Sequence, residues 1–109
     1  LAFANTIEAL TRGVSYLDVT VSGMGRGAGN CASEILLGFL KNPKYNILPI
    51  LDILENEIEP LKEQGVVWGY NIPYLLTGQL NQHPRTAIAA TKEKRTDYRN
   101  FYVELVDYK

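Results

Sequence analysis

The segment Asp18-Val19-Thr20-Val21-Ser22-Gly23-Met24-Gly25-Arg26-Gly27-Ala28-Gly29-Asn30 carries the strongest indication of the fold. It continues a stretch from Val14 that alternates apolar and polar residues, which is typical of a strand with one buried face. Four glycines then fall within seven positions. The apolar residues that follow recur at helical spacing, at Ala32, Ile35, Leu36 and Phe39. A strand over Val14 to Val21, a glycine loop and a helix in succession predict an α/β protein.

Helical patterns lie on both sides of this segment. Apolar residues at Phe3, Ile7 and Leu10 predict a helix from about Ala2 to Arg12. After the loop, helices are expected over Ile47 to Lys62, Ile72 to Leu80 and His83 to Lys92, and over a last stretch with the stripe Tyr98, Phe101, Tyr102 and Leu105. Pro60 should end or kink the first of these, because proline lacks the N–H of the helix ladder. The chain therefore divides into residues 1–42, with the strand and the loop, and a helical region over residues 43–109.

The composition limits the classes of protein. With 109 residues the chain suffices for one small domain but is too short for a closed barrel of about 250 residues. A net charge of −1 gives no electrostatic reason to expect nucleic acid or an anionic membrane as a partner. One cysteine and one histidine exclude an internal disulfide and a zinc-type cluster. No apolar run is long enough to span a bilayer and no signal-like segment is visible, so a cytoplasmic setting is expected.

The glycine loop has the composition of an anion cradle. Alternating glycines leave the backbone amides bare, and the positive end of the following helix dipole adds to their attraction for an oxyanion. Arg26 offers a charge-assisted contact to a carboxylate or phosphate. Asn30 stands where the N-cap of the helix is expected. The simpler alternative is a tight turn that binds nothing, but four glycines exceed what a turn needs.

A dinucleotide fingerprint is the rival interpretation of the same loop. Gly23-x-Gly25-x-x-Ala28 fits the G-x-G-x-x-G/A form. The fingerprint also requires a second parallel strand after the helix, for which residues 47–52 are the candidate stretch. Pro49 lies inside that stretch, and its helical stripe continues beyond it. We therefore rank this interpretation second.

From Asp18 to Asn30, with Glu34 four residues later, the sequence resembles the late-barrel strand and loop of the DRE-TIM metallolyases, an HMGL-like family. Their loop has the general form G-x-G-x-x-x-G-N between a strand and a helix. The segment Gly69-Tyr70-Asn71-Ile72-Pro73-Tyr74-Leu75-Leu76 resembles the helical region after the barrel in the 4-hydroxy-2-oxovalerate aldolases of this family. The resemblance implies a C-terminal fragment of a (β/α)₈ TIM barrel followed by a helical region, and an opening at Leu1 without methionine agrees with a fragment.

The resemblance also implies a chemistry. Members of the family hold a divalent cation, usually Mn²⁺ or Mg²⁺, through an Asp on the first strand and a His-x-His pair. The cation polarises a 2-oxo acid or acyl carbonyl and so promotes cleavage or formation of the adjacent C–C bond. By resemblance, Asn30 matches an extra or outer-sphere metal ligand, and Gly25, Arg26, Gly27 and Gly29 match the wall that binds substrate. The chain contains no His-x-His, so the parent protein is expected to be the enzyme and this chain alone to be inactive.

Three single residues have competing interpretations. Tyr70 matches the place of a general acid in the aldolase branch, but seven tyrosines in the chain make a packing role the simpler alternative. Cys31 is expected to be a small packed residue. His83, which precedes Pro84, is expected to cap or end a helix rather than to shuttle protons.

The resulting hypothesis is that the parent protein is a metal-dependent aldolase or lyase. In its most specific version, the parent enzyme cleaves a 4-hydroxy-2-oxo acid to pyruvate and an aldehyde. Its substrate is then a small 2-oxo acid or acyl compound, and the helical region is expected to form a homo-oligomer. A nucleotide-binding module and a non-catalytic helical interaction module are the alternatives. Binding of NAD without Mn²⁺ would favour the first alternative. The second requires the oligomeric state to change when the tail is truncated.

Overall fold

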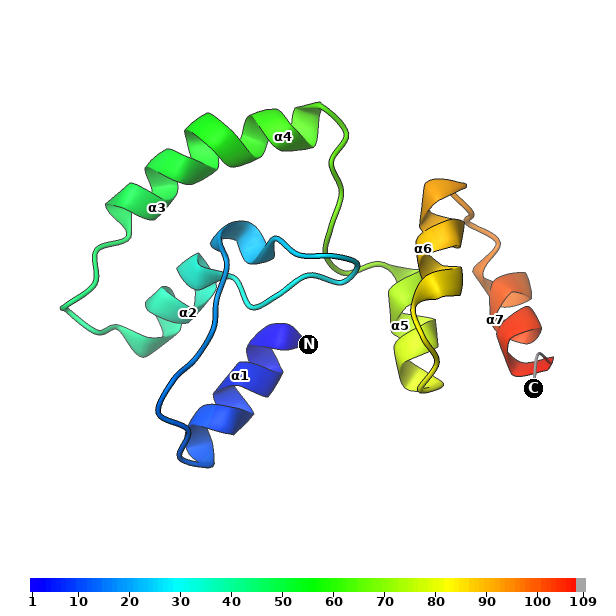
Figure 1. Ribbon diagram of the computed structural model, residues 1–109, viewed down its shortest axis with the longest axis horizontal. Coiled ribbons are helices and arrows are strands. Elements are labelled where there is room, and N and C mark those ends of the chain that lie inside the picture. The colour runs from blue at the N-terminus through cyan, green and yellow to red at the C-terminus, as the bar shows by residue number, and fades with distance from the viewer. Residues whose placement is uncertain (108–109) are drawn as a thin grey trace. The chain divides into compact units, whose positions relative to one another are not determined.

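The computed structural model describes residues 1–107 of the chain and is mostly helical (Figure 1). Internal contacts divide the chain into two compact units, the first from Leu1 to Gly69 and the second beginning at Tyr70. Residues 43–69, which the sequence analysis groups with the helical tail, thus belong to the same compact unit as the glycine loop. The glycine loop and residues 43–69 therefore lie in the first unit.

Helices of the first unit follow the apolar patterns of the sequence. They are α1 (Ala2–Thr11), the 3₁₀ turn η1 (Val21–Gly23), α2 (Ser33–Leu40), α3 (Leu48–Ile53), the π-helical turn η2 (Leu54–Ile58) and α4 (Glu59–Glu63). The helices expected before the strand and after the glycine loop are thereby confirmed. Phe3 of α1 and Phe39 of α2 meet edge to face with ring centroids 5.5 Å apart, which is a favourable aromatic geometry. This contact joins the helices on either side of the loop.

The expected strand over Val14 to Val21 is wrong for the described residues. Positions 14–19 have no regular secondary structure, and the next residue forms an isolated parallel bridge, Thr20 to Ala32. In this bridge the amide of Thr20 donates to the carbonyl of Cys31 at 3.0 Å, and the amide of Ser33 donates to the carbonyl of Thr20 at 2.8 Å. A strand needs neighbouring strands to bond its backbone, and residues 1–107 contain no other strand for it to join. The β-branched pattern therefore yields no sheet here.

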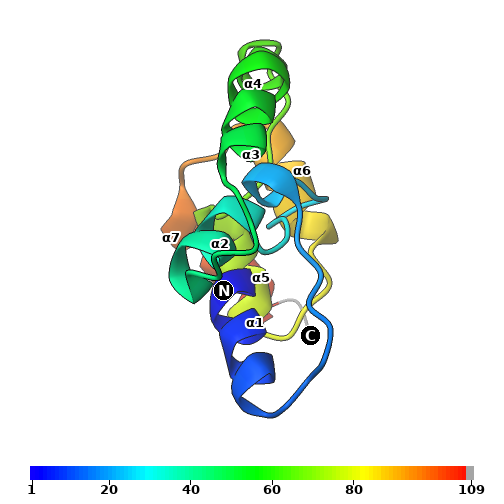
Figure 2. The ribbon, with the colours of Figure 1, turned by 90° about the vertical axis from the view of Figure 1, so that its left-hand side faces the viewer.

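The helix after Asn46 passes through Pro60 without ending there, so the first of the two effects expected of Pro60, an end or a kink, does not occur. α3, η2 and α4 follow one another directly and form one continuous rod in both ribbon views (Figure 1, Figure 2). Proline removes one N–H from the helix ladder, and its ring crowds the preceding turn. The wide π-helical turn Leu54–Ile58 stands just before Pro60, where it accommodates both the missing bond and the crowding.

The second unit is a cluster of helices with a core of its own. Its described helices are α5 (Ile72–Gln79), α6 (Arg85–Lys92) and α7 (Tyr98–Asp107), close to the expected ranges. Asn71 caps α5, since its side chain accepts from the amide of Tyr74 at 2.9 Å. The same side chain donates to Thr91 Oγ1 of α6 at 3.0 Å. The core consists of buried Ala90, Phe101 and Leu105, against which Leu76 and Leu80 pack.

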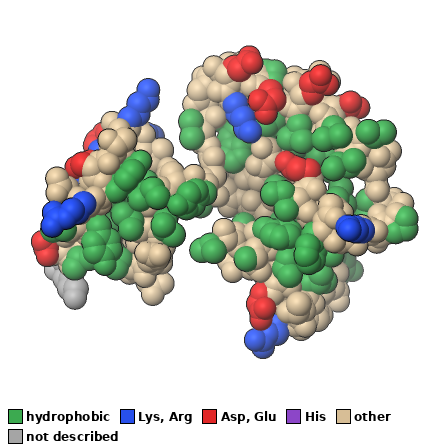
Figure 3. Space-filling view, turned by 180° about the vertical axis from the view of Figure 1, so that it is seen from behind, with side chains coloured by type: hydrophobic (Ala, Val, Ile, Leu, Met, Phe, Trp, Pro, Cys, Tyr) green, Lys and Arg blue, Asp and Glu red, His purple; other side chains and the backbone are tan. Residues whose placement is uncertain are grey.

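Both units carry apolar side chains on their surface. On the face seen in Figure 3, hydrophobic side chains gather on each of the two units. Exposed large residues include Tyr16, Ile35, Phe39, Leu48 and Leu51 in the first unit and Tyr98, Tyr102 and Val103 in the second. Apolar surface of this extent is typical of surface that other protein segments cover. Among residues 1–107, no helix combines the length and the apolar character needed to cross a membrane.

Candidate functional site

The glycine loop is closed on itself by backbone hydrogen bonds. The amide of Asn30 donates to the carbonyl of Gly23 at 2.8 Å, and the amide of Gly29 donates to the carbonyl of Arg26 at 3.3 Å. The bridge between Thr20 and Ala32 brings the two ends of the loop side by side. Because these bonds join main-chain atoms, the closure of the loop depends little on the side chains it carries.

Three glycines of this loop leave no room for a Cβ atom, and at Gly23 that atom would overlap the backbone oxygen of Asn30. At Gly25 a Cβ atom would overlap the carboxamide of Asn30, and at Gly29 a Cβ atom would overlap the carbonyl oxygen of Gly23. Gly29 also has a φ of +81°, in the left-handed region that residues with a side chain rarely adopt. The alternating glycines thus let two passes of the backbone approach each other and leave room for the Asn30 side chain.

Asn30 is not the N-cap of α2, contrary to the sequence-based expectation. Ala32 holds that position, because the residues after Asn30 first complete the bridge to Thr20, and no side chain caps the helix. The Asn30 carboxamide instead donates from its Nδ2 to the carbonyl of Met24 at 2.9 Å. A carbonyl oxygen can only accept, and Nδ2 is the one donor of the carboxamide, so the nitrogen faces Met24 and Oδ1 faces elsewhere. No side chain or amide of residues 1–107 donates to that oxygen, which leaves it available as a neutral ligand.

Several amides of the loop are also available. Those of Gly25, Arg26, Gly27 and Ala28 donate to no other residue of the described chain, so they are potential donors to a carboxylate or phosphate. Arg26 is exposed and forms no ion pair within residues 1–107. The amide of Gly29 is already bonded within the loop. Among the predicted substrate-binding residues, Gly29 therefore shapes the loop, whereas Gly25, Arg26 and Gly27 offer donors.

Ser22, at the start of the loop, is held by side chains from two other segments. Its φ of +59° lies in the left-handed region, which costs a residue with a side chain on the order of 1 kcal/mol or more. The Ser22 amide donates to Oε1 of Glu34 at 3.0 Å. Its carbonyl accepts from the indole Nε1 of Trp68 at 3.0 Å. These two bonds fix the peptide groups on both sides of a strained residue.

The segment Trp68–Gly69 makes further contacts with the loop. The amide of Gly69 donates to the carbonyl of Gly27 at 3.0 Å, and Cδ1 of Trp68 lies 3.6 Å from the position that a Cβ atom on Gly29 would take. The ammonium of Lys62 lies 5.8 Å from the centroid of the Trp68 ring. Sequence reasoning missed Trp68, because no periodic pattern marks it. Its one signal is an indole N–H, which needs an acceptor when the ring is partly buried.

The described residues do not hold a divalent cation by themselves. Within residues 1–107, no three acidic, histidine or cysteine side chains gather into a metal site. Hard cations such as Mg²⁺ take about six oxygen ligands, and Asn30 offers one carboxamide oxygen, Oδ1. This donor set fits an additional ligand to a cation but does not make a complete site.

Three further residues were singled out in the sequence: Tyr70, Cys31 and His83. Tyr70 is 74% exposed and is the first residue of the second unit, and its role as a general acid stays a prediction. Cys31 is buried, which confirms its interpretation as a packed residue. Nδ1 of His83 accepts from the amide of Arg85, the first residue of α6, at 3.1 Å. His83 therefore lies just before the N-cap of α6, which is Pro84, and bonds the first amide of the helix.

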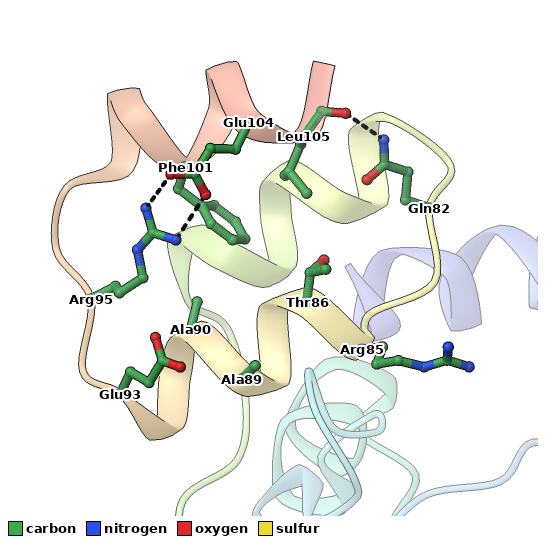
Figure 4. A pocket seen from close by; sticks show the side chains of 10 residues that line it. All are labelled: Gln82, Arg85, Thr86, Ala89, Ala90, Glu93, Arg95, Phe101, Glu104 and Leu105. Carbon is green, nitrogen blue, oxygen red and sulfur yellow. Dashed lines mark hydrogen bonds and ion pairs between the residues drawn. The ribbon is translucent and has the colours of Figure 1, made fainter. Parts of the chain in front are cut away.

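The second unit contains a hollow of about 480 Å³ beside α6 and α7 (Figure 4). Its lining is mixed and comprises Gln82, Arg85, Thr86, Ala89, Ala90, Glu93, Arg95, Phe101, Glu104 and Leu105. Arg95 donates to Asp97 at 2.8 Å and to Glu104 at 3.0 Å. These hydrogen bonds, that to Asp97 first, raise the pKa of Arg95, and the bond to Arg95 lowers the pKa of Asp97. Since two carboxylates engage its guanidinium, Arg95 is not free to bind an anionic ligand in the hollow.

The second parallel strand that the dinucleotide interpretation requires is not formed by the described residues. The stretch that would have to supply it is occupied by α3, Leu48–Ile53. No strand follows α2 anywhere in the described chain. The G-x-G-x-x-A match therefore lacks the structural context that gives the fingerprint its meaning.

Comparison with known proteins finds a matching family model and several relatives. A family model described as HMGL-like matches residues 1–54, which include the whole glycine loop. A 4-hydroxy-2-oxovalerate aldolase from Carboxydothermus hydrogenoformans is 29% identical over 110 residues, which are 96% of this chain and 33% of the relative. Another, from Moorella thermoacetica, is 30% identical over 111 residues, with 96% and 32% covered. An oxaloacetate decarboxylase from Mycobacterium tuberculosis is 51% identical over 41 residues, which are 38% of this chain and 12% of that protein. No solved structure matches.

These matches agree with the features of the loop. The chain spans about a third of the length of the two aldolases, and the family model covers the loop from Ser22 to Asn30 together with Glu34. The chain belongs to the HMGL-like family, among the DRE-TIM metallolyases that its glycine loop resembles, and its sequence is similar to those of 4-hydroxy-2-oxovalerate aldolases.

Proposed function

We propose that this chain is part of a divalent-metal-dependent carbon–carbon lyase that cleaves a 4-hydroxy-2-oxo acid to pyruvate and an aldehyde. The observation that carries the proposal is the closed glycine loop, in which the carboxamide oxygen of Asn30 is left without a donor among residues 1–107. Aldolases of this substrate class are among the chain's relatives. The proposal extends to the fold: residues 1–42 would be the last part of a TIM barrel and residues 43–109 a helical C-terminal region.

The chain's own residues would take three roles in such a site. The free amides of Gly25 and Gly27, with the exposed Arg26, would bind the carboxylate of the 2-oxo acid. Asn30 would give one neutral ligand to Mn²⁺ or Mg²⁺, whose other ligands are not among the described residues. A bound cation of this kind acts as a Lewis acid on a carbonyl oxygen. Tyr70 is the candidate for the proton transfer that accompanies cleavage.

The barrel proposal also accounts for two features of the first unit. The β-branched segment Val14 to Val21 stays without strand neighbours among the described residues. Apolar side chains such as Ile35 and Phe39 are more than half exposed. In a complete barrel, neighbouring strands and helices would bond the first and cover the second.

The test is an assay of pyruvate release from a 4-hydroxy-2-oxo acid in the presence of Mn²⁺. The protein that carries this chain at full length is expected to be active, whereas the chain alone is expected to be inactive for lack of a complete metal site. Asn30→Ala removes one oxygen ligand and is expected to lower kcat/KM by about 10- to 100-fold. Asn5→Ala, an exposed asparagine of α1 without a side-chain bond to residues 1–107, is the matched control and should leave kcat/KM unchanged.

The outcomes separate the parts of the proposal. If the full-length protein is active without a divalent cation, the proposed dependence on a metal is wrong. Cleavage by the chain alone would contradict its description as part of a larger site. Binding of NAD, without binding of Mn²⁺, would return the loop to the dinucleotide interpretation.

A further inference from the structure

Trp68 reaches the glycine loop from a distant part of the sequence. It is 46 positions from Ser22, whose carbonyl it bonds. Together with Gly69 it approaches the loop at three places: this segment donates hydrogen bonds to the carbonyls of Ser22 and Gly27, and Cδ1 of Trp68 lies 3.6 Å from the position that a Cβ atom on Gly29 would take. Two of these three contacts are hydrogen bonds to carbonyls, so their geometry constrains the direction of the loop's peptide groups.

Ser22 is the point where this constraint has most effect. A left-handed serine persists only where its surroundings hold it, and here Glu34 bonds its amide while Trp68 bonds its carbonyl. The next residue, Gly23, accepts the bond from the Asn30 amide that closes the loop. The conformation of Ser22 is therefore connected to the position of Asn30 through one residue and one hydrogen bond.

We infer that Trp68 is a positioning residue for the glycine loop, acting with Glu34 to hold Ser22 in its left-handed conformation and thereby to fix Asn30. Trp68 touches no reacting atom in this scheme. It acts through the main chain of the loop that would bind the substrate. The effect on catalysis rests on the proposed function, but the effect on the loop itself does not.

The first test measures the loop without reference to activity. In the full-length protein, Trp68→Phe keeps an aromatic ring beside Gly29 but removes the N–H that bonds Ser22. Hydrogen–deuterium exchange of peptides covering residues 20–32 is expected to become about fivefold to tenfold faster, as loss of one such bond implies. Val67→Ala, which changes a neighbouring residue that is 75% exposed, is the matched control and should leave the exchange unchanged.

Peptides from α1 and α2, which belong to the same unit as Trp68 and the loop, report whether this unit of the variant is folded. If these stay protected and the loop peptides exchange as in the unaltered protein, the inference is overturned. If Trp68→Phe speeds amide exchange in every peptide, the variant is unfolded and two Glu34 variants provide the test. Glu34→Gln keeps an oxygen that accepts from Ser22 and should preserve the slow exchange of the loop, whereas Glu34→Ala should speed it as Trp68→Phe is expected to. Equal exchange in the two Glu34 variants would overturn the inference.

The second test measures the consequence for binding, with oxalate and Mn²⁺ as the probe. Oxalate is a planar dicarboxylate that resembles the enolate of pyruvate, and its Kd is obtained by calorimetry. Trp68→Phe is expected to raise this Kd about fivefold to tenfold and to raise KM more than it lowers kcat, because a loosened loop weakens binding before it alters chemistry. Val67→Ala should bind as the unaltered protein does.

The two proposals fail differently. If the unaltered protein does not bind oxalate with Mn²⁺, the proposed function fails, and the exchange of the loop alone decides on Trp68. If the unaltered protein binds oxalate and Trp68→Phe binds it equally well, the proposed function stands and Trp68 has no part in positioning the binding loop.

Discussion

Gly25 and Asn30 compete for the same space. A Cβ atom on Gly25 would overlap the Asn30 carboxamide, which donates from Nδ2 to the carbonyl of Met24. Gly25 is thus needed so that another side chain can occupy its place, and not for a left-handed backbone. At the scale of single residues, this pairing is what allows Asn30 to present its oxygen.

A substitution at Gly25 should therefore displace Asn30. Gly25→Ala is expected to destabilise the protein by about 1 kcal/mol, because the exposed Asn30 side chain can rotate away and the main loss is its hydrogen bond to the Met24 carbonyl. Urea denaturation of the full-length protein measures this loss. The proposed aldolase activity should fall in parallel with that of Asn30→Ala.

Gly38 is the matched control for this change. It lies inside α2, and a Cβ atom there would meet nothing within 4 Å. Gly38→Ala should stabilise the protein by about 0.5–1 kcal/mol, because alanine favours a helix more than glycine does. Equal stabilities of the two variants would contradict the overlap at Gly25.

At the scale of elements, α7 is anchored at its beginning by an ion pair. Arg95 holds Asp97 and Glu104 together, and the guanidinium lies 5.2 Å from the centroid of the Phe101 ring. The amide of Phe101 donates to the carbonyl of Asp97 at 3.0 Å, so the aspartate stands where the helix starts. A carboxylate at this end of a helix is also favoured by the helix dipole.

This anchor should make the second unit sensitive to acid. The folded chain lowers the pKa of Asp97, first through the hydrogen bond from Arg95. The stabilisation is fully present above the ordinary aspartate pKa of about 3.9 and is lost as the pH falls through the lower value of the folded state. Asp97→Asn should therefore lower the urea midpoint at neutral pH and reduce its further drop in acid. Asp52→Asn, at an exposed aspartate of α3, should do neither.

The same scale explains which elements could be predicted. α1, α2 and α5 follow from local periodicity and end near their expected residues, since a helix bonds its own backbone. Local sequence could not decide whether Val14 to Val21 form a strand, because the backbone hydrogen bonds of a strand are made with other segments. The π-helical turn before Pro60, which lets the helix continue, could not be predicted either. No pattern of residues marks such a turn.

The candidate site was predictable to a similar extent. Its glycines and Asn30 form one contiguous motif, so the sequence indicated the loop and the residues in it. The N-cap at Asn30 was wrong because a bridge between Thr20 and Ala32 intervenes before α2 begins. Trp68 was missed because its contact spans 46 positions, and a long-range bond leaves no trace in local spacing.

At the scale of the whole molecule, each of the two units buries apolar side chains of its own. Cys31, Leu36 and Ile58 are buried in the first unit, and Ala87, Ala90, Phe101 and Leu105 in the second. Each core is small, so each depends on few side chains. Loss of a core residue should then be felt mainly in the unit that contains it.

Phe101→Ala tests this separation. Phe101 is 3% exposed, and its truncation should destabilise the second unit by about 3 kcal/mol through lost burial and the cavity left behind. Hydrogen exchange should rise in peptides of α5, α6 and α7 and stay unchanged in those of α1 and α2. Val103→Ala, an exposed residue of the same helix, should cost less than about 1 kcal/mol. A uniform rise over both units would contradict two independent cores.

The closure of the glycine loop through main-chain bonds has an evolutionary consequence. The exposed side chains of Arg26 and Ala28 take no part in that closure. Mutations at these two positions therefore escape the purifying selection that acts on a fold, and they can accumulate or be selected for a new substrate. Gly25, Gly29 and Asn30 lack that freedom, since each is tied to a neighbour by overlap or by a bond. Constrained and variable positions thus lie next to one another in the same short loop.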